Sequence, residues 1–247
     1  MKGTRLDERL VRDGLAETRT KAAALVRTGD VLVDDTPVDK PGTRVRDEAS
    51  VRVRGERPRF VSRGGEKLAG ALADLGIEVA GRHCLDVGAS TGGFSDALLK
   101  AGARSVTAVD VGYGQLAESL RQDPRVTVLE RTNARELRRD QLPHEPGLVT
   151  VDVSFVSVRL LLPRLAEVAP RADWLVMVKP QFEVGRGQVG KGGVVRDDGL
   201  RAGAADRVAE AAREHGFREV GRADSRLAGP KGNVEIFLDL RPLPADS

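Results

Sequence analysis

Cysteine, histidine and aromatic residues are scarce in this chain of 247 residues, and each scarcity argues against a class of function. The single cysteine, Cys84, cannot form a disulfide within the chain, and a reducing compartment such as the cytoplasm is expected. It is predicted to be a small buried apolar residue rather than a nucleophile. The three histidines are isolated and no C-x-x-C pair exists, so no metal site is predicted.

Long apolar segments are also missing. No run reaches the roughly 18 consecutive apolar residues that a transmembrane helix needs. The opening segment Met-Lys-Gly-Thr-Arg-Leu-Asp-Glu-Arg has no apolar core, so no secretory signal is expected. These absences predict a cytoplasmic protein without a membrane partner. Nothing in the sequence determines the oligomeric state, and a monomer is the default expectation.

Charged residues are plentiful, at 31% of the chain, but the net charge is only +3. Residues 1–63 carry 15 Lys and Arg against 11 Asp and Glu, whereas the remainder carries 25 against 26. The positive excess therefore lies in the first quarter of the chain. Such an excess is compatible with nucleic-acid binding or with a solvated surface, and charge alone does not decide between them.

The first quarter of the chain predicts two short helices followed by short strands. In residues 4–14, Leu6, Leu10 and Val11 share one helical face. Residues 18–29 begin at threonines that can cap a helix and end at a glycine that can close it.

A charged stretch that contains proline follows the short strands and is typical of a linker. We therefore predict a first domain at residues 1–57, a linker at 58–62 and a second domain at 63–247.

In the second domain, apolar strands alternate with helices, which predicts an α/β fold with a mostly parallel sheet between helix layers. Strands are expected at 83–87, 105–110, 126–129, 148–152 and 174–178, and helices from 63, from 93, near 115–121, at 157–168 and at 197–215. Two further strand-like runs, 217–223 and 233–240, have no helix between them. They are predicted to pair antiparallel at the sheet edge, with Glu235 in the final strand.

A glycine turn after the strand at 83–87 is the clearest sign of a ligand site. Gly88 follows the strand directly, and a helix is expected to start at Gly93. Asp110 ends the next strand at the spacing that suits binding of ribose hydroxyls. The glycines of this turn do not fit G-x-G-x-x-G, and the chain has no G-x-x-x-x-G-K-[ST], so a nucleoside cofactor other than a dinucleotide or a triphosphate is indicated. The alternative is a turn that needs glycine only for packing.

The string D-V-G-A-S-T-G-G-F resembles the first motif of S-adenosylmethionine-dependent methyltransferases. The resemblance implies S-adenosyl-L-methionine as cofactor and a Rossmann-like, seven-stranded domain. The cofactor-binding residues that it implies are Asp86, Gly88, Ala89, Ser90, Thr91, Gly92, Gly93, Phe94, Asp110 and Asn133.

Four charged residues are expected beside this turn. Asp152 and Lys179 end strands, Glu235 lies in the final strand, and Lys67 lies early in the first helix of the domain. Each alone could belong to a surface ion pair, but their shared placement favours a site.

The four residues resemble the K-D-K-E tetrad of FtsJ-type ribose 2′-O-methyltransferases. With the strings S-R-G-G-E-K-L, D-V-G-Y-G-Q-L, L-E-R-T-N-A-R, V-K-P-Q-F-E-V-G and G-N-V-E-I-F, the chain resembles the TlyA family, also labelled hemolysin. That resemblance implies 2′-O-methylation of cytidine in ribosomal RNA, with the RNA or a ribosomal subunit as partner. Lys179 is expected to be central, either as the base or as a group that orients the hydroxyl.

The segments R-L-D-E-R-L, T-R-T-K-A and R-T-G-D-V-L-V-D resemble an S4-type RNA-binding module. The resemblance makes five basic residues candidates for RNA contact: Arg5, Arg12, Arg19, Lys21 and Arg27. The alternative is a helical hairpin that only covers the second domain.

Two departures from the family pattern bear on the function. The R-x-W-V linker of the family reads Pro-Arg-Phe-Val here, with Phe60 in place of tryptophan. The chain lacks the further C-terminal helix associated with members that act on both subunits, which favours large-subunit RNA alone. The rival functions are a membrane-active hemolysin, a non-catalytic assembly factor, and a methyltransferase for a small molecule or a protein.

Overall fold

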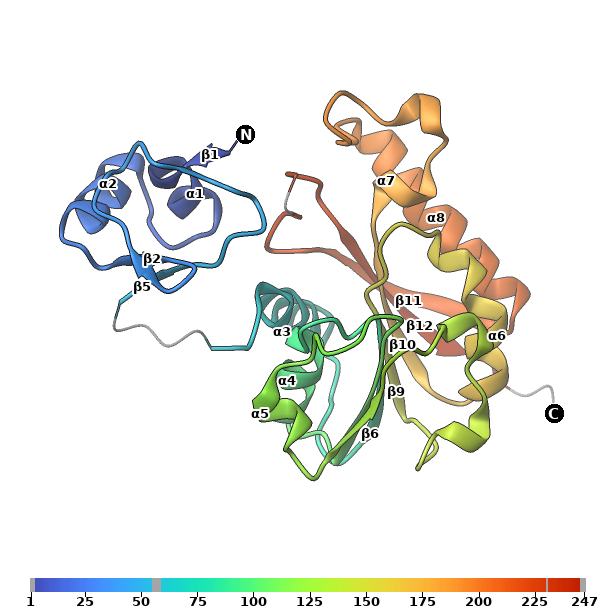
Figure 1. Cartoon of the computed structure of the whole chain (residues 1–247). Helices are drawn as coiled ribbons and strands as arrows, with labels where there is room; N and C mark the ends of the chain where they lie inside the picture. Colours follow the sequence, from blue (N-terminus) through green and yellow to red (C-terminus); the bar gives the residue numbers. More distant parts are fainter. Residues whose placement is uncertain (1–2, 55–58, 230, 245–247) are drawn as a thin grey trace. The chain divides into compact units, whose positions relative to one another are not determined.

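The computed structural model describes residues 3–54, 59–229 and 231–244 (Figure 1). The chain divides into two compact units, Met1–Arg59 and Phe60–Ser247. Pro58, the first residue of the predicted linker, lies outside the described residues. Phe60 is buried in the second unit. Its ring packs so closely against Gly65 that a Cβ on Gly65 would lie only 2.3 Å from the Cγ atom of Phe60.

The first unit packs two helices against short strands. Its elements are β1 (Thr4–Arg5), α1 (Leu6–Arg12), α2 (Arg19–Arg27), β2 (Val31–Val33), β3 (Thr36–Pro37), β4 (Arg44–Val45) and β5 (Val51–Val53). The predicted helices and the strand after them are present, and the hydroxyl of Thr18 caps α2 by accepting from the N–H of Lys21. The two-residue strands β1, β3 and β4 were not predicted, because two residues carry no periodicity. Leu6, Leu10 and Val26 form the centre of the core.

The second unit is a seven-stranded sheet of order β11-β12-β10-β9-β6-β7-β8. Its strands are β6 (His83–Val87), β7 (Ser105–Val109), β8 (Val126–Leu129), β9 (Leu148–Val151), β10 (Asp173–Val178), β11 (Phe217–Asp224) and β12 (Ile236–Pro242). Its helices are α3 (Arg63–Leu75), α4 (Gly93–Lys100), α5 (Glu118–Arg121), α6 (Leu162–Val168), α7 (Pro180–Glu183) and α8 (Asp198–Glu214). β11 and β12 form the predicted antiparallel pair at one edge.

The structure corrects the ends of several elements. β7 and β9 stop one residue earlier than expected, so Asp110 and Asp152 follow their strands instead of ending them. Glu235 directly precedes β12 and is not part of it. α5 is a single turn, shorter than the predicted helix, and α7, which begins at Pro180, was not predicted.

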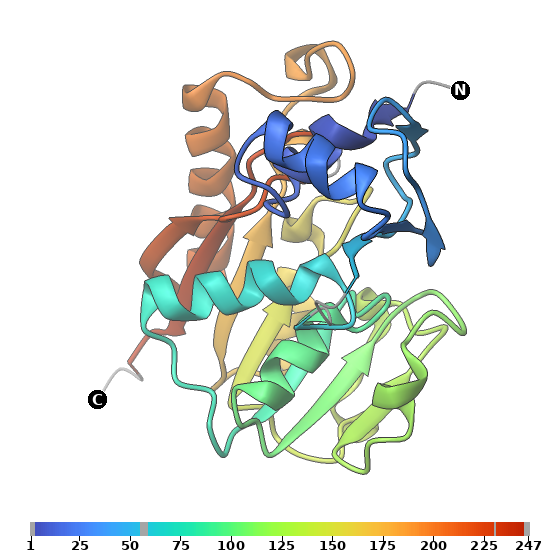
Figure 2. The ribbon, with the colours of Figure 1, turned by 90° about the vertical axis from the view of Figure 1, so that its left-hand side faces the viewer.

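Helices cover both faces of the sheet (Figures 1 and 2). The side chains of each strand alternate between the two faces. α6 and α8 pack on the face that carries Trp174, Val176 and Val178 of β10. α3, α4 and α5 pack on the face that carries Leu175 and Met177. Cys84 lies in this second layer, where burial raises the pKa of its thiol to about 12, so it is a packing residue.

The sheet has a topological switch between β6 and β9. The chain runs from β6 outward to β7 and β8 and then returns to the other side of β6 as β9. Ligands of open α/β sheets bind where the strand order reverses, beyond the carboxyl ends of the strands. Gly88 and Asp152 follow β6 and β9 at that point.

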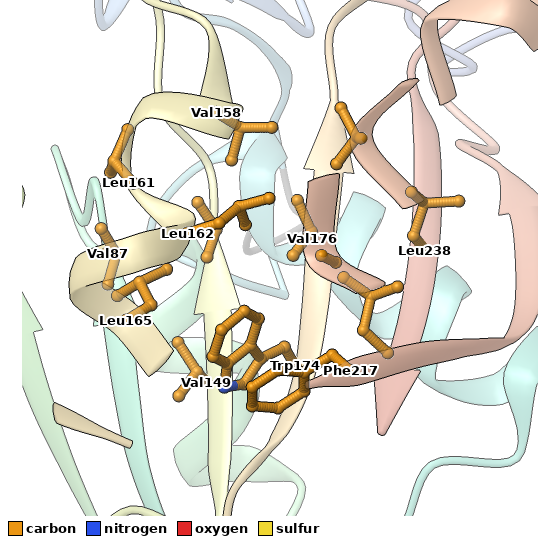
Figure 3. Close-up of a cluster of buried hydrophobic side chains, with 14 of the residues drawn as sticks. Val87, Val149, Val158, Leu161, Leu162, Leu165, Trp174, Val176, Phe217 and Leu238 are labelled. Carbon is orange, nitrogen blue, oxygen red and sulfur yellow. The ribbon is translucent and has the colours of Figure 1, made fainter. Parts of the chain in front are cut away.

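One of the two cores contains the stacked rings of Trp174 and Phe217 (Figure 3). Their rings stack with centroids 3.6 Å apart, and the indole N–H of Trp174 donates to the carbonyl of Ala169 at 3.3 Å. The stack joins the central strand β10 to the edge strand β11. It therefore ties the last strand pair to the rest of the sheet.

Loss of the Phe217 ring should destabilise the second unit. Phe217→Ala removes a fully buried ring and leaves a cavity, which costs about 3–5 kcal/mol in the free energy of unfolding. Fluorescence of Trp174, the single tryptophan, reports this unit during denaturant unfolding. The control Val220→Ala, at a side chain that is 43% exposed, should change the free energy by less than about 0.5 kcal/mol. Equal effects of the two variants would contradict this account of the core.

Candidate active site

Two adjoining cavities open beyond the carboxyl ends of the central strands. The first cavity, of about 450 Å³, is lined by residues that end or follow β6, β7 and β9, among them Gly88, Asp110 and Asp152. The second cavity, of about 310 Å³, is lined by residues after β10 and before β12, among them Lys179 and Glu235. Ser154 and Phe155 line both cavities, so the two spaces share one wall.

Gly88 brings the backbone after β6 against the backbone after β9. Its φ is +88°, and a Cβ there would lie 2.2 Å from the carbonyl oxygen of Asp152. Both conditions require glycine. Gly88 and Asp152 both line the first cavity, so this close approach sets the position of two parts of the cavity wall.

Asp110 is held rigidly at the edge of the first cavity. One carboxylate oxygen accepts from the N–H of Ser90 at 2.8 Å and the other from the N–H of Gly112 at 2.7 Å. Each oxygen retains capacity for a further hydrogen bond. Two of the other predicted cofactor residues, Ser90 and Asn133, line the same cavity.

Asp86 lies behind the cavity and does not line it. The carboxylate is fully buried and accepts from the hydroxyls of Ser95 at 2.6 Å and Thr150 at 3.1 Å. Burial raises the pKa of Asp86 to about 7. Because Ser95 belongs to α4 and Thr150 to β9, Asp86 braces the elements around the glycine turn.

The other predicted residues of the turn lie outside the wall of the first cavity. Gly92 packs against Leu116 and Leu120, and Gly93 lies so close to α3 that a Cβ would come within 2.9 Å of the N atom of Gly65. These two glycines serve close packing, which is the alternative that the sequence left open. The remaining three are placed as follows: Ala89 is buried beside Asp110, Thr91 is exposed, and Phe94 is buried against Phe237.

The four charged residues form two ion pairs. The Nζ atom of Lys179 lies 2.5 Å from Asp152 and donates to the hydroxyl of Ser154 at 2.7 Å. The Nζ atom of Lys67 lies 2.5 Å from Glu235, and both of these side chains are almost fully buried. Lys179 and Glu235 line the second cavity, which brings the two pairs to one site.

Sequence reasoning assigned no role to Ser154, Phe155, Lys231 or Asn233, which all line these cavities. Phe155 is 92% exposed and has a φ of +68°, an unusual backbone conformation for an aromatic residue. Its ring lies 5.5 Å from that of Phe182. The position of Phe155 three residues after Asp152 in V-D-V-S-F was the available signal, but it does not distinguish a rim residue from an ordinary loop.

In the first unit, four of the five predicted RNA-binding residues are already paired with carboxylates. Arg5 pairs with Asp7, Arg12 with Asp47, Arg19 with Asp7 and Glu8, and Lys21 with Glu17. Arg27 is exposed and has no ion pair with any described residue. The Lys21–Glu17 and Arg19–Glu8 pairs are exposed and weak, so an RNA phosphate can compete for these cations. Asp7, the partner of Arg5 and Arg19, is almost fully buried.

Two kinds of feature are absent from the described ranges. Residues 3–54, 59–229 and 231–244 contain no group of three or more His, Cys, Asp or Glu arranged to hold a metal ion. None of the helices described is both long and apolar enough to cross a membrane.

Comparison with protein families matches both units. Residues 60–241 match the FtsJ-like methyltransferase family, and residues 4–51 match the S4 domain. The first match covers most of the second unit, including both cavities.

Individual relatives cover nearly the whole chain. The 16S/23S rRNA (cytidine-2′-O)-methyltransferase TlyA of Mycobacterium tuberculosis is 54% identical over 96% of this chain and 89% of its own length. Hemolysin A of Brachyspira hyodysenteriae is 40% identical over 94% of this chain and 98% of its own length.

Among solved structures, a candidate hemolysin from Streptococcus thermophilus superposes with a TM-score of 0.80 at 38% identity, over 99% of this chain and 90% of that one. On these matches the chain belongs to the FtsJ-like methyltransferases, within the TlyA family that joins an S4 domain to the methyltransferase domain.

Proposed function

We propose that this protein transfers a methyl group from S-adenosylmethionine to the 2′-hydroxyl of a cytidine ribose in ribosomal RNA. The observation that carries the proposal is the Lys179–Asp152 ion pair on the boundary of the two cavities. A group transferred between ligands in these cavities must pass this boundary. The name of the Mycobacterium tuberculosis relative supports ribosomal RNA as the substrate, which in turn supports the cytoplasm as the place of action.

The first cavity suits the nucleoside part of the cofactor. Asp110 offers a fixed carboxylate to ribose hydroxyls, while Val109 and Val111 offer apolar surface. Gly88 lets the backbone after β6 lie against the carbonyl of Asp152, and both residues line this cavity. When bound, S-adenosylmethionine supplies an electrophilic methyl group.

Lys179 is the residue that we place at the reacting hydroxyl. Its ion pair with Asp152 and its hydrogen bond to Ser154 fix the Nζ atom at the boundary. A neutral amine there accepts the proton of the 2′-hydroxyl, whereas an ammonium orients the oxygen and stabilises its developing negative charge. The Lys67–Glu235 pair holds the wall next to Lys179 and orients the substrate ribose.

The first unit supplies RNA affinity in this proposal. We assign RNA binding to residues 1–57, the connection to 58–62 and catalysis to 63–247. The match to the S4 domain and the exposed Arg27 support the assignment. Phosphate contacts from such residues make binding fall steeply with salt concentration.

Cofactor affinity should depend on Asp110. Asp110→Ala removes the carboxylate that faces the ribose, and the Kd for S-adenosylmethionine, measured by calorimetry, should rise about 10- to 100-fold. Asp140→Ala, which removes an exposed carboxylate outside the cavity, is the matched control and should leave the Kd unchanged. An unchanged Kd for Asp110→Ala would remove Asp110 from the cofactor site.

Methyl transfer should depend on Lys179. In single-turnover reactions at saturating RNA, Lys179→Ala should lower the rate about 100- to 10,000-fold, as for loss of a positioned acid–base group. Lys179→Arg separates the two roles, because a guanidinium carries positive charge but does not accept a proton at neutral pH. Activity kept by Lys179→Arg would mean that charge is what the site requires.

The same variant tests the proposed function in cells. Ribose methylation of ribosomal RNA is mapped in cells without the gene and in cells that express wild type or Lys179→Ala. A cytidine methylated only with wild type is the expected result. An identical methylation map in all three would refute the proposed function and favour the non-catalytic assembly factor.

Removal of the first unit should separate RNA binding from cofactor binding. A protein that begins at Phe60, the start of the second compact unit, should bind S-adenosylmethionine with an unchanged Kd and methylate ribosomal RNA at a rate below detection. Methylation at the full-length rate would show that the S4 domain does not supply the RNA affinity.

A further inference from the structure

The second cavity has a wall made of two chain segments that Asn233 holds together. The amide of Asn233 is almost fully buried, donates to the carbonyl of Gly193 at 2.9 Å and accepts from the N–H of Val195 at 2.9 Å. These bonds fasten the glycine-rich loop between α7 and α8 to the segment that leads into β12. The wall is therefore built into the fold, although both segments are loops.

Lys231 lies in this wall beside the glycine-rich loop. A Cβ placed on Gly193 would lie 3.8 Å from the Nζ atom of Lys231, so the ammonium lies close to the loop backbone. Lys231 lines the second cavity together with Lys179 and Glu235. The side chain is exposed and forms no ion pair with any residue in the described ranges.

The charges around the second cavity do not cancel. Asp152 offsets the charge of Lys179, and Glu235 offsets that of Lys67. Lys231 is the remaining charged side chain of the lining, so the cavity carries one positive charge that no described carboxylate neutralises. An uncompensated cation in a partly enclosed space attracts an anionic group.

We infer that Lys231 and the adjoining loop form a subsite for an RNA phosphodiester, the one that flanks the methylated ribose. The inference rests on the proposed function, because it takes RNA as the ligand of the second cavity. A ribose whose 2′-hydroxyl is at Lys179 carries phosphates on its 3′ and 5′ oxygens, and these must lie in or next to the same cavity. A lysine ammonium binds such a phosphate as a point charge.

The test uses the full-length protein and ribosomal subunits from cells that lack the methylation. Lys231→Ala should raise the KM for the subunit about 10-fold, the loss expected for one charged contact. A binding contact of this kind leaves kcat near its wild-type value. The slope of log Kd for RNA against log salt should fall by about one, and Lys231→Arg should restore both KM and slope.

Arg218→Ala is the matched control. It removes an exposed positive charge from the same unit, at the end of β11 that pairs with Arg241 and lies away from Glu235. Its KM and salt slope should equal those of wild type. A wild-type KM for Lys231→Ala, or an equal loss of slope in both variants, would overturn the subsite.

RNA binding measured without cofactor separates this inference from the proposed function. If the wild-type protein transfers no methyl group to subunits but its salt slope still depends on Lys231, the proposed function fails and the contact of Lys231 with an RNA phosphate stands. If methylation proceeds and Lys231→Ala has the same salt slope as wild type, the subsite fails and the proposed function stands.

Discussion

The ion pair between Lys179 and Asp152 is the interaction on which the site depends. The two residues follow neighbouring parallel strands, β10 and β9, whose register pairs Val176 with Val151. This register brings a lysine and a carboxylate within 2.5 Å of each other at the same end of the sheet. Asp152 lines the first cavity and Lys179 the second, so the pair lies where the two cavities adjoin. Any shift of β10 against β9 would move both cavity walls.

The glycine turn after β6 serves the fold and the site together. Gly88 lets the chain pass against the carbonyl of Asp152, and both residues line the first cavity. Gly92 and Gly93, which look the same in the sequence, instead allow α4 to pack closely against its neighbours. Asp86, buried beneath the turn, holds α4 and β9 through two hydroxyl groups. One short motif thus combines a ligand-facing part with a packing part, and each depends on the other.

The basic residues of the S4 unit show why net charge was a weak guide to RNA binding. Most of the predicted cations have a carboxylate partner in the same unit, and 11 acidic residues leave the 15 basic residues of 1–63 with a net charge of only +4. The exposed Arg19–Glu8 and Lys21–Glu17 pairs are worth little, so they restrain the side chains without removing them from reach of an RNA phosphate. Arg9 differs, because it is buried and bonds to Asp13 and to backbone carbonyls, so its role is structural.

Most of the strands and helices in their order, the two-unit organisation and the family could be predicted from the sequence, because periodicity, glycine turns and long motifs are local properties of the chain. The sequence also predicted Lys67, Asp152, Lys179 and Glu235 as a set. Which of these residues pair is visible only in the folded structure, because Lys67 and Glu235 are 168 positions apart. The same holds for the shared wall at Ser154 and Phe155, the packing role of Gly92 and Gly93, and the loop that Asn233 fastens. Each of these depends on distances between segments remote in sequence, and no local pattern encodes such a distance.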